Sequence, residues 1–394
     1  MLSKKVSSIT PSFTIGISTK VKELKNQGIE IVNLSIGEPD FFTPESAKNS
    51  AIKAIEANKT KYDAAPGLTE LRNAIVEKLK TENGLNYKTE EIVVSSGAKH
   101  AITNALIAIT DPGDEIIIPK PYWVSYPEMV KLTGGTPILV DTQGSNSFKL
   151  TAEELENAIT DKTKALFITN PSNPTGAVYT KDDLKGIVEL CVKKDIYIIA
   201  DEIYERICYL DEFTSIASFS EEAKAITITI NGLSKSAAMT GWRLGYTATN
   251  AEMAKAISSI QGHLVSHPST ITQWAAVEAV QNCQADTQEM VSHYKSRRNE
   301  AIKLFGEIDE LSIIEPNGAF YVMINTSELN KYLGNQESYS IEICNRLLDD
   351  HRVALVPGIA FGNDDYIRMS YAASIENVRE GIKRLSDFIA SLKK

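Results

Sequence analysis

Short apolar runs alternate along the chain with longer segments whose apolar residues recur at helical spacing. The clearest runs are residues 92–94, 115–119, 165–169, 196–201 and 225–230. Between two of them, residues 183–194 read DLKGIVELCVKK, with apolar side chains three and four positions apart as in an amphipathic helix. Strands that alternate with helices predict an α/β fold, in which a mostly parallel sheet is covered by helices on both faces. Because ligands of such sheets bind beyond the carboxyl ends of the strands, the residues that follow each run are the candidates for chemistry.

The pattern changes near residue 288. Residues 293–308 form a long charged segment that predicts a helix, and short apolar runs and a final amphipathic helix follow it. We therefore expect a large ligand-binding domain over residues 46–287 and a smaller α+β domain over residues 288–394. Residues 1–45 contain a helix-like segment and the loop SIGEPDFFTP, and we expect them to pack with the smaller domain.

Composition and charge narrow the classes of partner. The 394 residues are 23% charged and 43% hydrophobic, as in an ordinary globular protein, and the net charge of -10 disfavours nucleic acid and anionic membranes. The four cysteines have no CxxC spacing, so we expect neither a disulfide framework nor a zinc site, and a reducing cytoplasm fits best. The five histidines form no ligand motif, and we expect no metal. No segment approaches the ~18 apolar residues of a membrane span.

The first candidate for chemistry is the segment 95–109, SSGAKHAITNALIAI, where a predicted strand ends in a turn of small residues and a helix begins. Free backbone N–H groups and the helix dipole make such a turn suitable for binding phosphate. A lone turn of this kind is more often a simple strand-to-helix connection with a serine cap. The motifs GxGxxG and GxxxxGK[ST] are absent, which disfavours a dinucleotide or nucleoside triphosphate and leaves a small phosphorylated ligand.

Two further motifs directly follow predicted strands. Residues 170–179, NPSNPTGAVY, form a proline-rich loop that presents Asn173. In IIADEIYE, Asp201 ends a strand and Tyr204 follows three positions later. Taken alone, the first is an ordinary turn and the second a helix cap.

The last motif is NGLSKSAAMTGWRLGY, residues 231–246, in which Lys235 lies between two serines and Arg243 follows eight positions later. The order of these motifs along one alternating chain resembles the fold-type I pyridoxal phosphate enzymes, specifically the class I aminotransferases and their bacterial aspartate aminotransferase branch. The likeness also includes PSFTIGISTK, SIGEPDF, PYWVSYPEM and IRMSYA, and so spans the chain from end to end. It implies bound pyridoxal 5′-phosphate and a mostly parallel seven-stranded sheet.

The resemblance assigns roles around the cofactor ring. Lys235 would bind the cofactor aldehyde covalently and move a proton between the substrate Cα and the cofactor. Asp201 would pair with the pyridine nitrogen and keep it protonated. Tyr204 and Asn173 would hydrogen-bond the phenolic oxygen, and Trp123 would lie against the ring face.

The resemblance also implies a binding site for the cofactor phosphate. Its members are Gly97, Ala98, Lys99, Ser234 and Arg243. Arginine presents a planar fork that suits phosphate oxygens. Tyr62 matches the tyrosine that the partner subunit contributes in this family, which predicts a homodimer with shared active sites.

Substrate recognition follows from the same resemblance. Arg368 would clamp the α-carboxylate of the amino acid, and the backbone of Gly37, together with Trp123 and Asn173, would complete that site. The distal carboxylate of aspartate would bind Lys99, with Ser12 and Thr14. A lysine at the start of a helix is disfavoured by ~0.3–1 kcal/mol, which indicates a purpose for Lys99. The implied reaction is transfer of the amino group of L-aspartate to 2-oxoglutarate, giving oxaloacetate and L-glutamate by a ping-pong mechanism.

Several alternatives share the cofactor residues. An aminotransferase for aromatic or aliphatic amino acids would differ chiefly at Lys99. Relatives that also accept prephenate carry a basic residue before the PSxT segment, where this chain has Thr10. Fold-type I lyases and synthases reuse Lys235 and Asp201, and some transcription regulators carry a similar domain behind a DNA-binding module that this sequence does not show.

Overall fold

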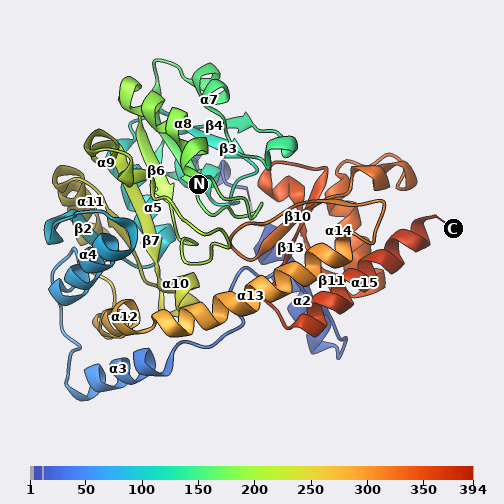
Figure 1. Ribbon diagram of the computed structural model, residues 1–394, viewed down its shortest axis with the longest axis horizontal. Helices are drawn as coiled ribbons and strands as arrows, with labels where there is room; N and C mark the ends of the chain where they lie inside the picture. Colours follow the sequence, from blue (N-terminus) through green and yellow to red (C-terminus); the bar gives the residue numbers. More distant parts are fainter. Residues whose placement is uncertain (1–3, 11–12, 394) are drawn as a thin grey trace.

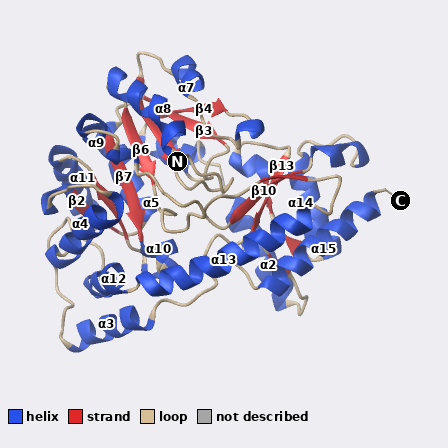
Figure 2. Ribbon diagram, viewed as in Figure 1, coloured by secondary structure: helices blue, strands red, loops and turns tan. Residues whose placement is uncertain are grey.

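Seven strands form one sheet, in the order β2-β8-β7-β6-β5-β3-β4. The sheet lies at the centre of the larger part of the molecule (Figure 2). The strands are β2 (Ile92–Ser95), β3 (Glu115–Lys120), β4 (Thr136–Asp141), β5 (Thr163–Thr169), β6 (Tyr197–Asp201), β7 (Thr227–Gly232) and β8 (Gly245–Ala248). Only β8 runs against its two neighbours. The computed structural model describes residues 4–10 and 13–393, and within them the expected mostly parallel sheet with helices and a smaller α+β part is confirmed.

Helices cover both faces of this sheet. One face packs against α5 (Ala98–Ile109), α6 (Tyr126–Thr133) and α11 (Ala251–Leu264). The other packs against α7 (Ala152–Ala158), α8 (Lys181–Lys194) and α9 (Glu221–Ile226). A third buried cluster joins β2 and β8 to α3 (Glu45–Glu56), α4 (Thr69–Asn83) and α12 (Thr270–Asn282). The strands between two helical layers are buried on both faces, which explains why they read as continuous apolar runs.

Two strands of the sheet were not evident from apolar runs. Strand β4 lies at the edge of the sheet, and its residues are exposed or half-buried, so its sequence TPILVD mixes polar and apolar side chains. Strand β8 has only four residues and begins at Gly245. Gly245 lies against the start of α5, where an added Cβ would come 2.4 Å from the backbone nitrogen of Ala98.

The smaller part contains an antiparallel sheet in the order β12-β13-β10-β9. Its strands are β9 (Ser312–Ile314), β10 (Tyr321–Asn325), β12 (Val356–Pro357) and β13 (Tyr366–Ser370). The helices α14 (Tyr339–His351) and α15 (Ile375–Leu392) contribute to the buried cluster beneath it. Beyond α1 (Lys4–Ser7) and α2 (Phe13–Asn26), the N-terminal segment joins this part through β1 (Val32–Asn33), which pairs in parallel with β11 (Val353–Ala354).

A single long helix, α13 (Gln284–Phe305), connects the larger and smaller parts (Figure 1). The expected division between residues 287 and 288 falls inside this helix, which continues through both. None of the helices in the described ranges combines the length and apolar composition that a membrane span requires.

Candidate active site

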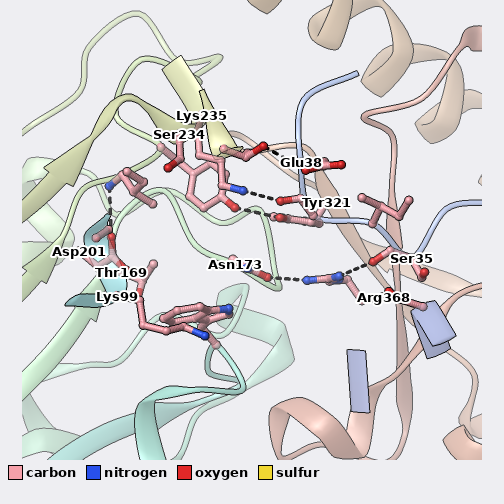
Figure 3. Close-up of a pocket in the computed structure, with 18 of the residues that line it drawn as sticks. Ser35, Glu38, Lys99, Thr169, Asn173, Asp201, Ser234, Lys235, Tyr321 and Arg368 are labelled. Carbon is pink, nitrogen blue, oxygen red and sulfur yellow. Dashed lines mark hydrogen bonds between the residues drawn. The ribbon is translucent and has the colours of Figure 1, made fainter. Parts of the chain in front are cut away.

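A cavity of about 600 Å³ lies between the carboxyl edge of the large sheet and the smaller part (Figure 3). Eleven of the residues expected from the sequence line it: Gly37, Ala98, Lys99, Trp123, Asn173, Asp201, Tyr204, Ser234, Lys235, Arg243 and Arg368. They come from segments up to 331 positions apart, Gly37 to Arg368. The fold therefore brings the motifs of both parts together at one site.

The alternation of side chains along β6 determines where Asp201 points. Ile198 and Ala200 belong to the cluster beneath α7 and α8, whereas Ile199 belongs to the cluster beneath α5 and α6. Because side chains alternate along a strand, Asp201 faces the α5 and α6 side as Ile199 does. Thr169 ends the neighbouring strand β5 in register with Asp201.

Both carboxylate oxygens of Asp201 accept hydrogen bonds. The Tyr126 hydroxyl donates to Oδ2 over 2.6 Å, and the Ile203 backbone N–H reaches Oδ1 over 3.2 Å. Burial raises the pKa of Asp201, while these two donors and the Lys235 ammonium oppose the rise. An acid held in this way can bind a protonated nitrogen inside the cavity.

Lys235 lies in α10 (Leu233–Ser236), directly after β7. Its Nζ donates to the carbonyl oxygen of Gly37. The pKa of Lys235 is lowered to about 8, chiefly by burial and also by Arg368 and Arg243, although Glu38 and Asp201 oppose this fall. Near neutral pH a measurable fraction of this amine is thus uncharged, as a nucleophile or a base requires.

The start of α5 fits a phosphate group. Gly97 precedes the helix at φ +90, and the first N–H groups of a helix have no acceptor within it. A Cβ on Gly97 would come 2.6 Å from Nη2 of Arg243, so the guanidinium lies directly against this turn. Ser234 and Arg243 line the cavity beside Ala98. Backbone donors, a hydroxyl and a guanidinium together match the phosphate of pyridoxal phosphate.

Arg368 is a buried cation, with 3% of its surface exposed. Its Nη1 donates to Oδ1 of Asn173 and its Nη2 to the carbonyl oxygen of Ser35, each over 2.9 Å (Figure 3). Among the described residues, Nε has no hydrogen-bond partner, and the groups that act electrostatically on the guanidinium are the hydroxyls of Tyr321 and Tyr204, not a carboxylate. A buried charge without a counter-ion is costly, so this side chain is suited to bind an anionic ligand.

Lys99 lies at the opposite side of the cavity from Arg368 (Figure 3), with Nζ 4.9 Å from the centre of the Trp123 ring. Burial and the neighbouring Arg243 lower the pKa of Lys99. Ser12 lies outside the described residues, and Thr14 is in α2, but its side chain is not described. Residues further along α2 reach the mouth of the cavity instead: Ser18, Thr19 and Lys22.

Tyr62 does not reach the cavity within one chain. Its side chain is 90% exposed and meets the His267 ring edge-on at 5.8 Å. Its role at the cofactor stays a prediction that depends on a second subunit.

Several lining residues were not expected from the sequence: Ser35, Glu38, Tyr126, Thr169, Thr240 and Tyr321. A signal existed for Tyr126, which follows Trp123 by three positions at the start of α6 and so lies near it. Tyr321 carried none, because YVMIN reads as a core strand. It reaches the cavity only because the smaller part packs there.

Comparisons with known proteins agree with this geometry. The family model for aminotransferase class I and II matches residues 29–385. The aspartate aminotransferase of Bacillus sp. (strain YM-2) is 44% identical over 390 residues, covering 99% of each chain. The probable aspartate/prephenate aminotransferase of Aquifex aeolicus (strain VF5) is 43% identical over 387 residues, covering 98% of this chain and 97% of that one.

Solved structures match as well. The aspartate aminotransferase of Thermus thermophilus with maleate superposes with a TM-score of 0.93 at 40% identity, covering 98% of this chain and 99% of that one. At this identity the likeness extends beyond the fold to the family.

Proposed function

This chain belongs to the class I and II aminotransferases, which are pyridoxal-phosphate-dependent enzymes, and from this premise we propose that it transfers the amino group of L-aspartate to 2-oxoglutarate. The products are oxaloacetate and L-glutamate, formed in a ping-pong sequence. The observation that carries the proposal is the pair of cations on opposite sides of the cavity, Arg368 and Lys99. Two separated cations match the two carboxylates of aspartate and glutamate. The names of the Bacillus and Thermus relatives support the same preference.

Bound pyridoxal phosphate supplies an electron sink for the pair of electrons left at Cα when its proton is removed. Lys235 holds the cofactor and, with its lowered pKa, takes the Cα proton on Nζ. Asp201 binds the pyridine nitrogen, held in place by Tyr126 and the Ile203 N–H. Tyr204 and Asn173 bind the phenolic oxygen.

Arg368 binds the α-carboxylate with its fork of donors and thereby orients the Cα–H bond toward Lys235. The ammonium of Lys99 binds the distal carboxylate. Neutral and aromatic amino acids lack that carboxylate, so they leave Lys99 without an ionic partner in the cavity. Selectivity for dicarboxylates then follows from the free energy of that ion pair.

We further propose that the active enzyme is a homodimer to which each subunit contributes Tyr62. Several large apolar side chains are exposed on the chain: Phe42, Ile52, Ile55, Tyr62, Leu264 and Val265. Leu264 and Val265 come three and two positions before His267, against which the Tyr62 ring lies. Exposed apolar side chains grouped in this way support association with a second copy. A cytoplasmic location is also proposed, because all four cysteines are free thiols.

The decisive test compares amino donors with 2-oxoglutarate as the acceptor. Purified, cofactor-loaded protein is assayed for glutamate formation with L-aspartate, L-alanine and L-phenylalanine, and separately with glutamate as donor and prephenate as acceptor. The proposal expects kcat/KM to be highest for aspartate and double-reciprocal plots to be parallel. Faster transfer from phenylalanine, or to prephenate, would assign the chain to the aromatic or prephenate alternatives.

A further inference from the structure

Tyr321 lies where three separate parts of the chain meet. It is the first residue of β10 and is 1% exposed. Its hydroxyl lies 2.8 Å from the hydroxyl of Tyr204. The guanidinium carbon of Arg368 lies 4.3 Å from the centre of its ring, and a Cβ on Gly37 would come 2.6 Å from its hydroxyl. One side chain thus contacts the carboxylate clamp, the tyrosine at the cofactor and the N-terminal loop.

The register of the small sheet creates this contact with Arg368. Strand β10 pairs with β13 so that Tyr321 is opposite Ser370 and Met323 is opposite Arg368. Tyr321 and Arg368 are therefore diagonal neighbours on one face of the sheet, within reach of an aromatic ring and a long side chain. The cation lies over the face of the ring, where the ring quadrupole attracts it.

The direction of the hydrogen bond between the two tyrosines has a consequence for the cofactor. A tyrosine hydroxyl has one hydrogen to donate. If Tyr321 donates to Tyr204, the Tyr204 hydrogen is free for an acceptor in the cavity. If Tyr204 donates to Tyr321, that hydrogen is no longer available to the cavity.

The charges around the pair favour the first direction. Burial raises the pKa of Tyr321, but the Arg368 cation and the Tyr204 hydroxyl oppose the rise. Burial and the contact with Tyr321 raise the pKa of Tyr204 well above its usual range. Arg368 opposes this rise too, but it ranks behind both of those causes, whereas for Tyr321 it ranks directly after burial. The more acidic phenol of a pair is the better donor, which is Tyr321 here.

We propose that Tyr321 is a positioning residue that donates its hydroxyl hydrogen to Tyr204 and so directs the Tyr204 hydrogen toward the phenolic oxygen of the cofactor. The proposal rests on the proposed function, because Tyr204 is assigned there to that oxygen. It adds a connection between Arg368, which binds the carboxylate, and Tyr204, which acts at the ring.

The test uses Tyr321→Phe, which keeps the ring under Arg368 and removes only the hydroxyl. In cofactor-loaded protein without substrate, the pH midpoint of the visible absorbance change reports how tightly the proton beside the phenolic oxygen is held. In this variant Tyr204 no longer accepts a hydrogen bond from residue 321, which weakens the bond that Tyr204 donates to the phenolic oxygen of the cofactor. The phenolic anion is then less stabilised, and it holds the neighbouring proton more tightly. We expect the pH midpoint to rise, because the acid dissociation constant of that proton falls by about two- to threefold.

Two outcomes would overturn the proposal. A fall in the midpoint would mean that Tyr204 donates to Tyr321 in the native protein, and an unchanged midpoint would limit Tyr321 to packing. The shift should also vanish when Tyr321→Phe is made in a Tyr204→Phe background, because the effect acts through Tyr204. Tyr371→Phe is the matched control: it removes a buried hydroxyl that contacts the half-buried Tyr209, away from the cavity.

This readout involves no amino acid substrate. The role of Tyr321 can therefore be refuted while aspartate transfer is confirmed. It can also be confirmed if the preferred substrate proves to be a different amino acid. The two proposals are tested separately.

Discussion

The hydroxyl of Tyr126 donates to Oδ2 of Asp201 over 2.6 Å inside the protein, and the Tyr126 ring stacks on Phe167 at 4.4 Å between ring centres. The stacking fixes the direction of the hydroxyl, and the hydrogen bond favours the ionised carboxylate. Asp201 therefore depends on Tyr126 to stay charged in a buried position.

We predict that Tyr126→Phe lowers kcat and moves the acid limb of the pH-rate profile upward. In the proposed mechanism Asp201 acts when ionised, and loss of the donor raises its pKa further. A hydrogen bond to a charged group contributes ~1.5–3 kcal/mol, which corresponds to about one to two pH units. Steady-state rates from acid to neutral pH measure this shift.

Tyr179→Phe provides the control for this variant. Tyr179 is equally buried, but its hydroxyl accepts from the Leu150 N–H and does not reach Asp201. It should lower stability without moving the acid limb. Equal shifts in the two variants would contradict a specific role for Tyr126.

Lys99→Met should raise KM for aspartate about ten- to a hundredfold and leave KM for alanine nearly unchanged, because a charge-assisted bond to the distal carboxylate contributes ~1.5–3 kcal/mol. Methionine keeps the apolar stem beside Trp123. Lys22→Met is the matched control, since Lys22 also lines the mouth of the cavity but is not assigned to the substrate. Equal losses for aspartate and alanine would remove Lys99 from substrate recognition.

Arg368→Lys should behave differently, because every amino acid carries an α-carboxylate. Lysine keeps a charge but loses the fork that bonds Asn173 and Ser35 and that we propose binds the α-carboxylate. We expect kcat/KM to fall by about a hundredfold or more for aspartate, alanine and phenylalanine alike, in line with ~3 kcal/mol for a lost buried pair. A loss confined to aspartate would place the distal carboxylate, and not the α-carboxylate, at Arg368.

The sequence predicted those parts of the site that follow buried strands. Asp201 is the last residue of β6, and Lys235 lies three positions after the end of β7. Burial of both strands on both faces makes them visible as apolar runs. Parallel strands end at the same edge of the sheet, so residues at the ends of neighbouring strands such as β6 and β7 are placed to line one crevice.

Contacts between the two parts of the molecule could not be predicted in this way. Tyr321 and Ser35 reach the cavity through pairing and packing over long sequence separations. Tyr321 has no local motif, and Ser35 begins the motif SIGEPDF, which gives no sign of its contact with Arg368. Tyr126 could have been found from its spacing to Trp123, but its bond to Asp201 depends on how α6 packs on the sheet.

Gly245→Ala should weaken binding of pyridoxal phosphate to the apoenzyme by about tenfold or more. The new Cβ would come 2.4 Å from the Ala98 nitrogen, so the start of α5 must move, at a cost of ~1–3 kcal/mol. Gly241→Ala is the control, because nothing lies within 4 Å of its added Cβ. Titration of the apoenzyme measures both dissociation constants, and equal affinities would show that this turn does not hold the phosphate.

Glu202 lies next to Asp201 but faces a buried cluster behind the site. Burial and the neighbouring Glu205 raise the pKa of Glu202 to about 8, although Ser215 and the Ile216 N–H donate to it. Glu205 is buried too, but Lys78 pairs with it and holds its pKa below the ordinary value. At neutral pH the native protein therefore keeps Glu202 largely protonated and Glu205 charged.

This arrangement predicts that Glu202→Gln changes how stability depends on pH. In the wild type, Glu202 binds its proton more tightly in the folded protein than in the unfolded chain, and this adds to the free energy of unfolding. That stabilisation is complete below pH 4.5 and is lost as the pH rises toward 8. The loss approaches ~1.4 kcal/mol in the free energy of unfolding per pH unit within that window. Glutamine keeps an acceptor for Ser215 and Ile216 and never ionises. Urea unfolding of both cofactor-loaded proteins at several pH values should show the variant gaining stability over the wild type from pH 5 to 8, whereas a constant difference would mean that Glu202 is ionised throughout.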